Sequence, residues 1–384
     1  MPKPKNVTYL LGAGASAESL PVVSNMKGFY KPYIKILKDF IPDSERWYTL
    51  RENFSELCEK IIKHNSPDTF AKKLWLRGNE GRKIIELKYF LSGFFLWLED
   101  VLSIEKLFYF SDEIIGSDWG GKIISTSIDL RYDSFLATIL QKNKSGEPYP
   151  VLPNHINIIS WNYDTQIERA YCDFFSQKTG IEQAVKHLKM YPKPHYKVNI
   201  ETEGTQTLFD VKVVKLNGTA GDFISYEDSK NGNIRIYDGE TSEEKLKKIL
   251  ENNYQFLKKQ ANIDADSTMN EVMNIKTESP FLNFAWESEN PISKKGVDLA
   301  IAIMEKTDVL IIIGYSFPNF NREIDKKLLN AFWRAGSGKT IYYQAPQPSL
   351  DGLVRRLKGL TDSQFHKQII PYDETDQFLI PYEI

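Results

Sequence analysis

The sequence LLGAGAS, at residues 10–16, begins as an apolar run typical of a β-strand and ends in a glycine-rich turn. Together with Ala17, the residues from Gly12 onward match the glycine fingerprint of dinucleotide-binding proteins, with alanine in the third position. Gly12 allows a tight turn out of the strand, and Gly14 allows the backbone to approach a pyrophosphate. We expect the helix that follows to offer its free N–H groups and positive dipole end to that anion. Because similar turns occur without a ligand, the motif needs support from other segments.

Three further segments have the same character. They are ISWNYD (159–164), VKLNGT (214–219) and VLIIIGYSFP (309–318). In each of them an apolar run stops at polar or glycine-containing residues. Ligands of open α/β sheets bind in the crevice beyond the carboxyl ends of the strands, so these ends together predict one binding site.

The apolar patterns predict an α/β protein. Short β-branched runs indicate strands at about 7–11, 156–160, 211–216, 308–313 and 340–344. Helical periodicity fits about 27–40, 46–64, 68–77, 83–108, 130–142, 164–176, 242–259, 293–306 and 320–335. Strands separated by long helical stretches favour a parallel sheet that helices cover on both faces. We therefore predict a Rossmann-like parallel sheet with a large helical insertion.

The spacing of the predicted strands indicates a single domain, residues 1–384, with two insertions. Nearly 145 residues separate the first two strands, and most of them have a helical pattern, so 25–125 is interpreted as a helical insertion. The second insertion, 220–290, is polar and mixed, and NGNIRIYDGE (231–240) predicts a hairpin or loop. ANIDADSTMN (261–270) has spaced oxygen ligands but lacks the glycine and final glutamate of a calcium loop, which favours a solvated loop.

Composition limits the kind of protein this is. Lys and Arg number 49, and Asp and Glu number 51, so we expect no basic face and no direct nucleic-acid binding. Two cysteines, Cys58 and Cys172, are too few for a four-thiolate zinc site and suggest reduced thiols in a cytoplasmic protein. No leader is evident, and no run approaches the ~18 apolar residues of a membrane helix. FLSGFFLWL (90–98) is expected to form a core or interface helix.

A dehydrogenase is disfavoured by the residues that follow the glycine turn. Hydride-transferring enzymes have a second strand there, which ends about 20 residues on in an acidic residue that binds the adenosine ribose. Residues 25–40, NMKGFYKPYIKILKDF, instead have a helical pattern. Asp39 lies inside that predicted helix and not at a strand end.

The segments LLGAGAS, SWNYD, KLNGT and IIIGYSFP, in this order, resemble the sirtuin family. RYDSFLATIL (131–140), LPNHINIISWNYDTQIERAY (152–171) and GYSFPNFNREID (314–325) are similar to its prokaryotic branch of sirtuin-like NADases that act in defence against phage. The resemblance covers the predicted sheet core. It implies a sirtuin-like domain that binds NAD as its substrate.

The sequence departs from sirtuin deacylases where their chemistry needs particular residues. Trp161 replaces the glutamine of their second motif, and Pro21 does not begin their nicotinamide-covering loop. Their four-cysteine zinc module is absent, so we expect no zinc and no other metal. Their general base is a histidine before glycine, whereas Asn217 precedes Gly218 here. Because an amide does not take up a proton near neutral pH, protein deacylation is disfavoured.

A different histidine is the alternative source of a base. The chain has five, and His187 and His195 precede the strand that ends near Asn217. Each of them is also explained as a surface or structural residue.

Cleavage of the nicotinamide–ribose bond needs less acid–base catalysis than deacylation does. The nicotinamide ring is positively charged in NAD, which activates the bond, and it leaves as a neutral molecule. Such an enzyme acts by positioning water and stabilising an oxocarbenium-like transition state. We expect Asn162 to do this, Asn217 to orient ribose or water, and Asp164 to support the local geometry. Helix capping alone is the alternative explanation of Asn162 and Asp164.

The resemblance also implies which residues hold the ligand. Those expected to contact the pyrophosphate are Gly12, Ala13, Gly14, Ala15 and Ser16, beside Asn162. Those expected on the adenosine side are Gly314, Tyr315 and Ser316, with Asn321 at its ribose. A tight turn that closes a buried strand is the alternative explanation of GYSFP.

The expected function is hydrolysis of NAD to nicotinamide and ADP-ribose, which by resemblance depletes NAD in an infected cell. Such activity implies regulation by assembly, as a homo-oligomer or with the separate hexameric ATPase that accompanies some relatives. Aromatic residues that would supply oligomer contacts, or pack in a core, are Phe94, Phe95, Trp97, Phe108 and Tyr109. Because Asn217 replaces the histidine, a non-catalytic module that binds NAD or ADP-ribose and regulates a defence complex is the alternative.

Overall fold

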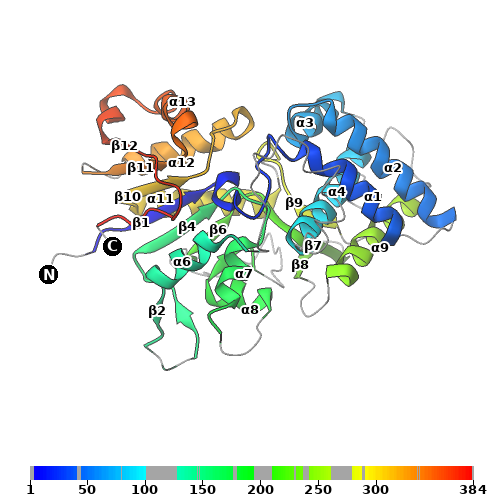
Figure 1. Ribbon diagram of the computed structural model, residues 1–384, viewed down its shortest axis with the longest axis horizontal. Coiled ribbons are helices and arrows are strands. Elements are labelled where there is room, and N and C mark those ends of the chain that lie inside the picture. The colour runs from blue at the N-terminus through cyan, green and yellow to red at the C-terminus, as the bar shows by residue number, and fades with distance from the viewer. Residues whose placement is uncertain are drawn as a thin grey trace.

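The computed structural model describes residues 4–40, 45–78, 80–100, 128–144, 146, 148–175, 180–193, 210–228, 231–236, 242–260, 279–287, 290–334, 336 and 338–382. Its largest element is a seven-stranded parallel sheet in the order β12-β11-β10-β1-β4-β6-β5 (Figure 1). The strands are β1 (Val7–Leu11), β4 (Ile156–Ser160), β5 (Met190–Tyr191), β6 (Val213–Lys215), β10 (Val309–Ile313), β11 (Thr340–Gln344) and β12 (Ile369–Tyr372). The predicted α/β fold with a Rossmann-like parallel sheet is confirmed.

The first strand lies in the middle of this sheet. β4 pairs with one side of β1 and β10 with the other, so that Leu11 is opposite both Ser160 and Ile313. The order of strands therefore reverses at β1, which is the place where open α/β sheets bind ligands beyond the carboxyl ends of their strands. All residues of β1 and β10 are buried, as expected for strands covered on both faces.

Two groups of helices cover the two faces of the sheet. Leu10 and Ile312 point to one face, whereas Tyr9 and Ile311 point to the other, because successive strand residues alternate. The helices on the Leu10 face are α11 (Pro291–Lys306), α12 (Arg322–Arg334) and α13 (Gln347–Lys358). Those on the Tyr9 face are α6 (Leu130–Ile139), α7 (Gln166–Cys172) and α8 (Ile181–His187). We call this sheet with its six helices the sheet lobe.

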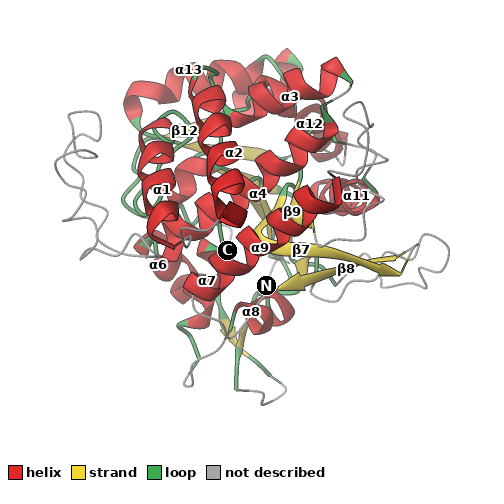
Figure 2. Ribbon diagram, turned by 90° about the vertical axis from the view of Figure 1, so that its right-hand side faces the viewer, coloured by secondary structure: helices red, strands yellow, loops and turns green. Residues whose placement is uncertain are grey.

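The two segments interpreted as insertions pack against each other and form a second body, the helical lobe (Figures 1 and 2). The first segment supplies α1 (Lys27–Phe40), α2 (Glu45–Ile62), α3 (Pro67–Arg77) and α4 (Gly81–Asp100). The second supplies α9 (Ser242–Gln260) and an antiparallel sheet of β7 (Gly218–Asp228), β8 (Asn231–Ile236) and β9 (Ser279–Leu282). Buried side chains of both segments belong to one hydrophobic cluster. The predicted loop at 261–270 lies outside the described residues.

The apolar run 90–98 lies in α4, and it is buried in the core of the helical lobe. Tyr33 of α1 packs against Phe90, Phe94 and Trp97, with ring centroids 5.4, 5.6 and 5.5 Å away. Since these aromatic side chains are used inside the lobe, they are not available for contacts between copies of the chain. Phe108 and Tyr109 lie outside the described residues.

Several elements differ from the sequence-based expectation. The predicted helix 130–142 ends at Ile139, because β2 (Gln141–Lys142) follows and forms a hairpin with β3 (Pro150–Val151). β5, β12, α8 and α13 were not predicted. Short 3-10 helices are η1 (Ala13–Ser16), η2 (Asn319–Asn321) and η3 (Ser363–Gln368).

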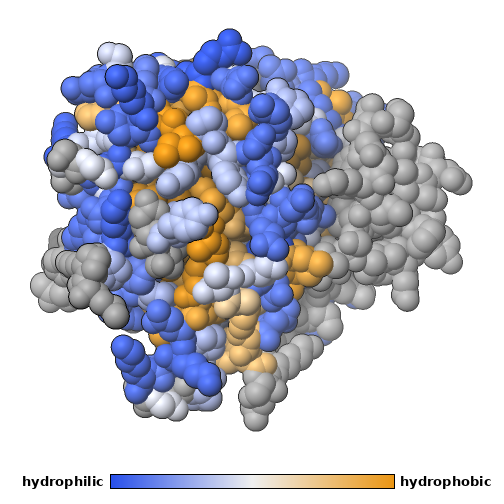
Figure 3. Space-filling view, turned by 60° about the vertical axis from the view of Figure 1, so that its left-hand side comes forward, coloured by the Kyte–Doolittle hydropathy of each residue, from blue (hydrophilic) through white to orange (hydrophobic). Residues whose placement is uncertain are grey.

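The surface is largely hydrophilic on the face of Figure 3, with a hydrophobic band between the polar side chains. Among the described residues, the exposed large apolar side chains are Val23, Tyr48, Trp75, Leu76, Leu130, Ile370 and Tyr382. No helix in the described part of the chain is long and apolar enough to cross a lipid bilayer.

Candidate functional site

A cavity lies between the two lobes, at the carboxyl ends of β1, β4 and β10. The cavity is open to solvent, and the empty space between its walls, with the solvent at its mouth included, is ≈ 1120 Å³. The predicted site residues that line it are Gly12, Ala13, Ser16, Asn162, Asp164, Asn217, Gly314, Tyr315, Ser316 and Asn321. Gly14 and Ala15 do not line it. Residues up to about 300 positions apart in sequence therefore share one cavity, as parallel strand ends allow.

The glycine turn packs directly on the turn that follows β10. A Cβ atom on Gly14 would lie 2.7 Å from Gly314 Cα, and one on Gly12 would lie 2.5 Å from Tyr315 Cα. The N–H of Gly12 donates to Ile313, and that of Gly14 donates to Gly314. These glycines are thus required by the close approach of two backbones, whatever binds in the cavity.

The expected helix N-terminus after the glycine turn is not there, so this prediction was wrong. The turn continues into η1, which has only four residues, and α1 begins at Lys27. A single 3-10 turn carries little of the dipole of a long helix, because that dipole is a sum over aligned peptide units. An anion at this end of the cavity would therefore meet single N–H groups and hydroxyls.

Arg131 holds the outer side of the glycine turn. Its Nη2 donates to the carbonyl oxygens of Gly14 and Ala15, both at 3.2 Å. The same guanidinium pairs at 2.6 Å with Asp129, which is fully buried and accepts from the N–H of Glu18. Because Arg131 lies outside the cavity lining, we assign it a structural role, which the sequence did not reveal.

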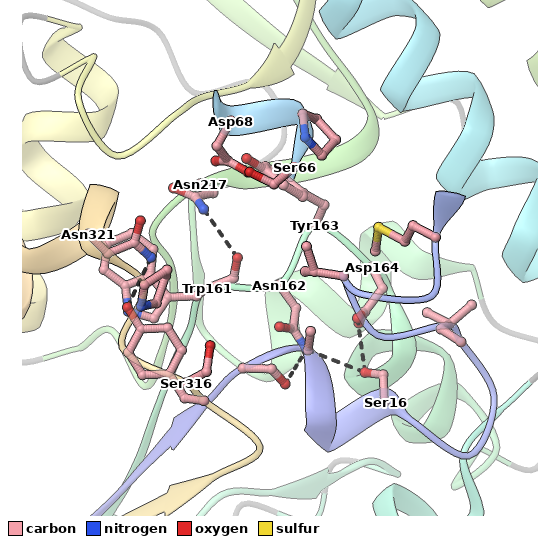
Figure 4. A pocket seen from close by; sticks show the side chains of 18 of the residues that line it. Ser16, Ser66, Asp68, Trp161, Asn162, Tyr163, Asp164, Asn217, Ser316 and Asn321 are labelled. Atoms are coloured by element: carbon pink, nitrogen blue, oxygen red, sulfur yellow. Dashed lines mark hydrogen bonds between the residues drawn. The ribbon is translucent and has the colours of Figure 1, made fainter. Parts of the chain in front are cut away.

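Asn162 presents its side-chain carbonyl to the cavity. Its Nδ2 donates to Gly12 O at 3.0 Å and to Ser16 Oγ at 3.4 Å. A backbone carbonyl can only accept, which fixes the orientation of the amide. No described residue donates to Asn162 Oδ1. The amide is therefore held by its nitrogen, and its oxygen is left for a ligand (Figure 4).

Asp164 orients Ser16 and does not face a ligand. Ser16 Oγ donates to Asp164 Oδ2 at 2.9 Å, and the N–H of Gln166 donates to Asp164 Oδ1 at 3.3 Å. Burial raises the pKa of Asp164, while the ammonium group of Lys215 opposes this rise. Lys215 pairs with Glu168 at 2.8 Å and donates to the backbone carbonyl of Asp164. The N-cap residue of α7 is Thr165, so these contacts fit the expected support of local geometry by Asp164 better than capping alone.

Asn217 lies near Asn162 in the cavity, and its Nδ2 donates to the carbonyl oxygen of Trp161 at 3.3 Å. Its Oδ1 accepts from none of the described residues, so it too is open to a ligand. No histidine is among the described residues that line the cavity. His187 instead lies in α8 against Tyr149, with ring centroids 3.6 Å apart. His195 lies outside the described residues.

The wall expected on the adenosine side is a buried hydrogen-bonded chain. Asn321 Nδ2 donates to Tyr315 Oη at 2.9 Å, and Tyr315 Oη donates to both carboxylate oxygens of Asp325 at 2.9 Å. Trp161 stacks on Tyr315 at 5.9 Å with an interplanar angle of 11°. Burial raises the pKa of Asp325 to about 8. Tyr315 therefore offers its ring and backbone to the cavity, because its hydroxyl is already bonded.

The helical lobe supplies the opposite wall, which sequence reasoning missed. Leu91 and Phe95 come from α4, and Ser66 and Asp68 come from the start of α3. Figure 4 shows Ser66 and Asp68 beside Asn217, across the cavity from Ser16. Burial raises the pKa of Asp68 to about 6. No local motif marks these residues, because they reach the site only through the packing of the helical lobe.

A scan against protein-family models and a search of curated proteins found no match to this chain. Among the described residues there is also no group of three or more His, Cys, Asp and Glu side chains that could hold a metal ion.

Proposed function

We propose that this cavity binds NAD and hydrolyses its nicotinamide–ribose bond, giving nicotinamide and ADP-ribose. The observation that carries the proposal is a set of side-chain oxygen acceptors to which none of the described residues donates a hydrogen bond. Asn162 Oδ1 and Asn217 Oδ1 face the same cavity with their amide nitrogens already bonded. Ribose hydroxyls donate hydrogen bonds, and a ribosyl group that loses nicotinamide becomes cationic, so both match such acceptors.

The apolar part of the lining suits the nicotinamide end of the ligand. Phe95, Trp161, Tyr163 and Phe284 line the cavity together with Leu91. Aromatic and aliphatic walls exclude bulk water and strengthen the electrostatic interactions of the few polar groups between them. Nicotinamide is a good leaving group because it departs as a neutral molecule, while its positive charge moves to the ribosyl group, where the amide oxygens can stabilise it.

The diphosphate would lie on the glycine turn and the turn after β10. The described lining includes no Lys or Arg, so backbone N–H groups and the hydroxyl of Ser316 are the donors we assign to it. Gly314, Tyr315 and Asn321 would meet the adenosine side, as the resemblance to sirtuin-like NADases implies. The same resemblance supports a role in NAD depletion during phage defence, in the cytoplasm, as a homo-oligomer or beside a hexameric ATPase.

One observation favours a second function. Because Asn217 stands where sirtuin deacylases have histidine and the described lining holds no other histidine, the cavity would also suit a regulatory module that binds NAD or ADP-ribose without cleaving it. The two functions differ in turnover and not in affinity.

Product analysis tests the proposal. Purified protein is incubated with NAD, nicotinamide and ADP-ribose are quantified by chromatography, and NAD binding is measured in parallel by calorimetry. Hydrolysis predicts equal amounts of the two products, rising with time. Binding without product would reject hydrolysis and support the regulatory module, whereas neither binding nor product would reject both.

A further inference from the structure

Among the described residues that line the cavity, Asp68 is the one that brings a carboxyl group from the helical lobe. Asp68 is the second residue of α3, after Ser66 at the N-cap and Pro67. Ser66 Oγ accepts from the N–H of Thr69 at 3.2 Å, so capping of α3 does not depend on Asp68. In the described part of the chain no salt bridge pairs Asp68, and the hydrogen bond from its own backbone N–H is the interaction that lowers the pKa of its carboxyl group.

An unpaired carboxylate in such a place is unfavourable for stability alone, because burial without a cationic partner penalises the charged form. Asp68 is partly buried, and this burial raises the pKa of its carboxyl group to about 6. The ionisable groups that Asp68 influences electrostatically are Tyr30 of α1 and Tyr163 after β4, and Glu287 influences Tyr163 as well. Both phenols stay neutral near that pH, since their own pKa values are raised by burial.

The other carboxyl groups near the cavity, those of Asp164 and Asp325, already accept hydrogen bonds from the protein. Asp164 accepts from Ser16 and from the N–H of Gln166, and Asp325 lies behind Tyr315 and accepts its hydroxyl. Among the described residues that line the cavity, Asp68 thus has the carboxyl group whose oxygens accept no hydrogen bond from another residue and can bind a ligand or water. Figure 4 places it beside Asn217, the amide that cannot take up a proton.

We infer that Asp68 is the general base of this site and takes the proton from the water that attacks C1′ of the nicotinamide riboside. This inference rests on the proposed hydrolysis of NAD. The bond between C1′ and the nicotinamide nitrogen breaks, and its electron pair neutralises the pyridinium. The water oxygen bonds to C1′, one of its protons passes to the Asp68 carboxylate, and solvent later takes that proton. One NAD and one water thus give nicotinamide, ADP-ribose and one proton.

Asp68→Asn tests this inference, because it keeps the size of the side chain and removes its basicity. We expect kcat to fall about 100-fold or more, within the usual range for loss of a general base. The Kd for ADP-ribose, measured by calorimetry, should change by less than about threefold, since the apolar walls and the amides remain. Asp133→Asn is the matched control, because Asp133 is an exposed acidic residue in the first turn of α6. It should retain full activity.

Two further readouts distinguish a base from a residue that merely shapes the site. Wild-type kcat/KM should fall with decreasing pH around the pKa of about 6 of Asp68, and Asp68→Asn should lose this dependence. Formate should restore part of the activity of Asp68→Ala by replacing the missing carboxylate. Full activity of Asp68→Asn, or a loss that formate does not rescue and that leaves the pH profile unchanged, would overturn the inference alone. Absence of turnover by the wild type would overturn both the inference and the proposed function.

Discussion

Ser16 connects Asn162 and Asp164, two of the side chains that the sequence predicted in the site. Its hydroxyl donates to Asp164 Oδ2 and accepts from Asn162 Nδ2. The buried carboxylate therefore orients the hydroxyl, and the hydroxyl orients the amide. Sequence reasoning assigned Ser16 to the pyrophosphate because it ends the glycine turn. Its contacts instead make it a positioning residue for Asn162, which a linear motif could not show.

Removing the Ser16 hydroxyl should therefore affect both stability and rate. In Ser16→Ala the buried Asp164 loses a donor, so we expect a loss of about 1–3 kcal/mol in the free energy of unfolding. Misorientation of Asn162 should lower the rate of nicotinamide release by about tenfold to 100-fold. Urea unfolding and initial rates measure these effects. Ser24→Ala, at an exposed position before α1, is the control and should change neither. Equal rates for Ser16→Ala and the wild type would refute the role of Ser16.

Asp325 should make the free energy of unfolding depend on pH. Its pKa of about 8 in the folded protein is above that of an unfolded aspartate, about 3.9. Between these values the folded state binds more protons than the unfolded state, so the free energy of unfolding falls as pH rises. The contribution is at most about 1.4 kcal/mol per pH unit. Asp325→Asn should remove it, so the mutant should gain stability relative to the wild type from about pH 5 to about pH 8. A constant difference in urea unfolding across this range would argue against a protonated Asp325.

At the scale of elements, the sequence predicted best what local patterns control. The strands β1, β4 and β11 begin and end where expected, since their continuous apolar runs stop at turns. β5 has two residues and β12 contains Pro371, so neither has a clear strand pattern. The sequence predicted the glycine turn but not its packing against the turn that follows β10. Contact between Gly14 and Gly314 depends on the pairing of β1 with β10, which no local pattern specifies.

The interlocked turns predict how glycine substitutions behave. Gly14→Ala places a Cβ 2.7 Å from the backbone of Gly314 and should destabilise the protein by about 1–3 kcal/mol. Gly352→Ala is the matched control, because nothing lies within 4 Å of its Cβ in α13. It should stabilise by about 0.5–1 kcal/mol, since alanine favours helix. Thermal unfolding of both variants checks this. An unchanged stability of Gly14→Ala would show that the turns do not pack this closely.

At the scale of the whole molecule, the site exists because two lobes meet. Glu99 at the end of α4 accepts from the N–H of Thr165 at 2.8 Å and so fixes the helical lobe beside Asp164. Tyr163 donates from its hydroxyl to Asn283 O, and its own carbonyl accepts from Ala220. The sequence indicated two separate insertions but not their common core, because contacts between distant segments leave no local signature. Asp68 was missed for the same reason.

A ligand between the lobes should protect both of them. Hydrogen exchange of the wild type with ADP-ribose at about 100 times its Kd should slow at residues 12–16 and also at 66–70, because opening either wall would release the ligand. The gain is at most about 2.7 kcal/mol at that ligand concentration. Residues 347–358 of α13, none of which lines the cavity, are the internal control. Protection confined to 12–16 would mean that the helical lobe takes no part in binding.

The most direct test of the whole account is the rate of nicotinamide release from NAD by the wild type and by Asn162→Ala. Asn162 is held by Gly12 and Ser16 with its oxygen facing the cavity, so we expect turnover by the wild type. We expect a loss of about 100-fold or more in the variant, as when a preorganised polar group is removed from an active site. Equal rates in the two proteins, or no nicotinamide from the wild type, would contradict it.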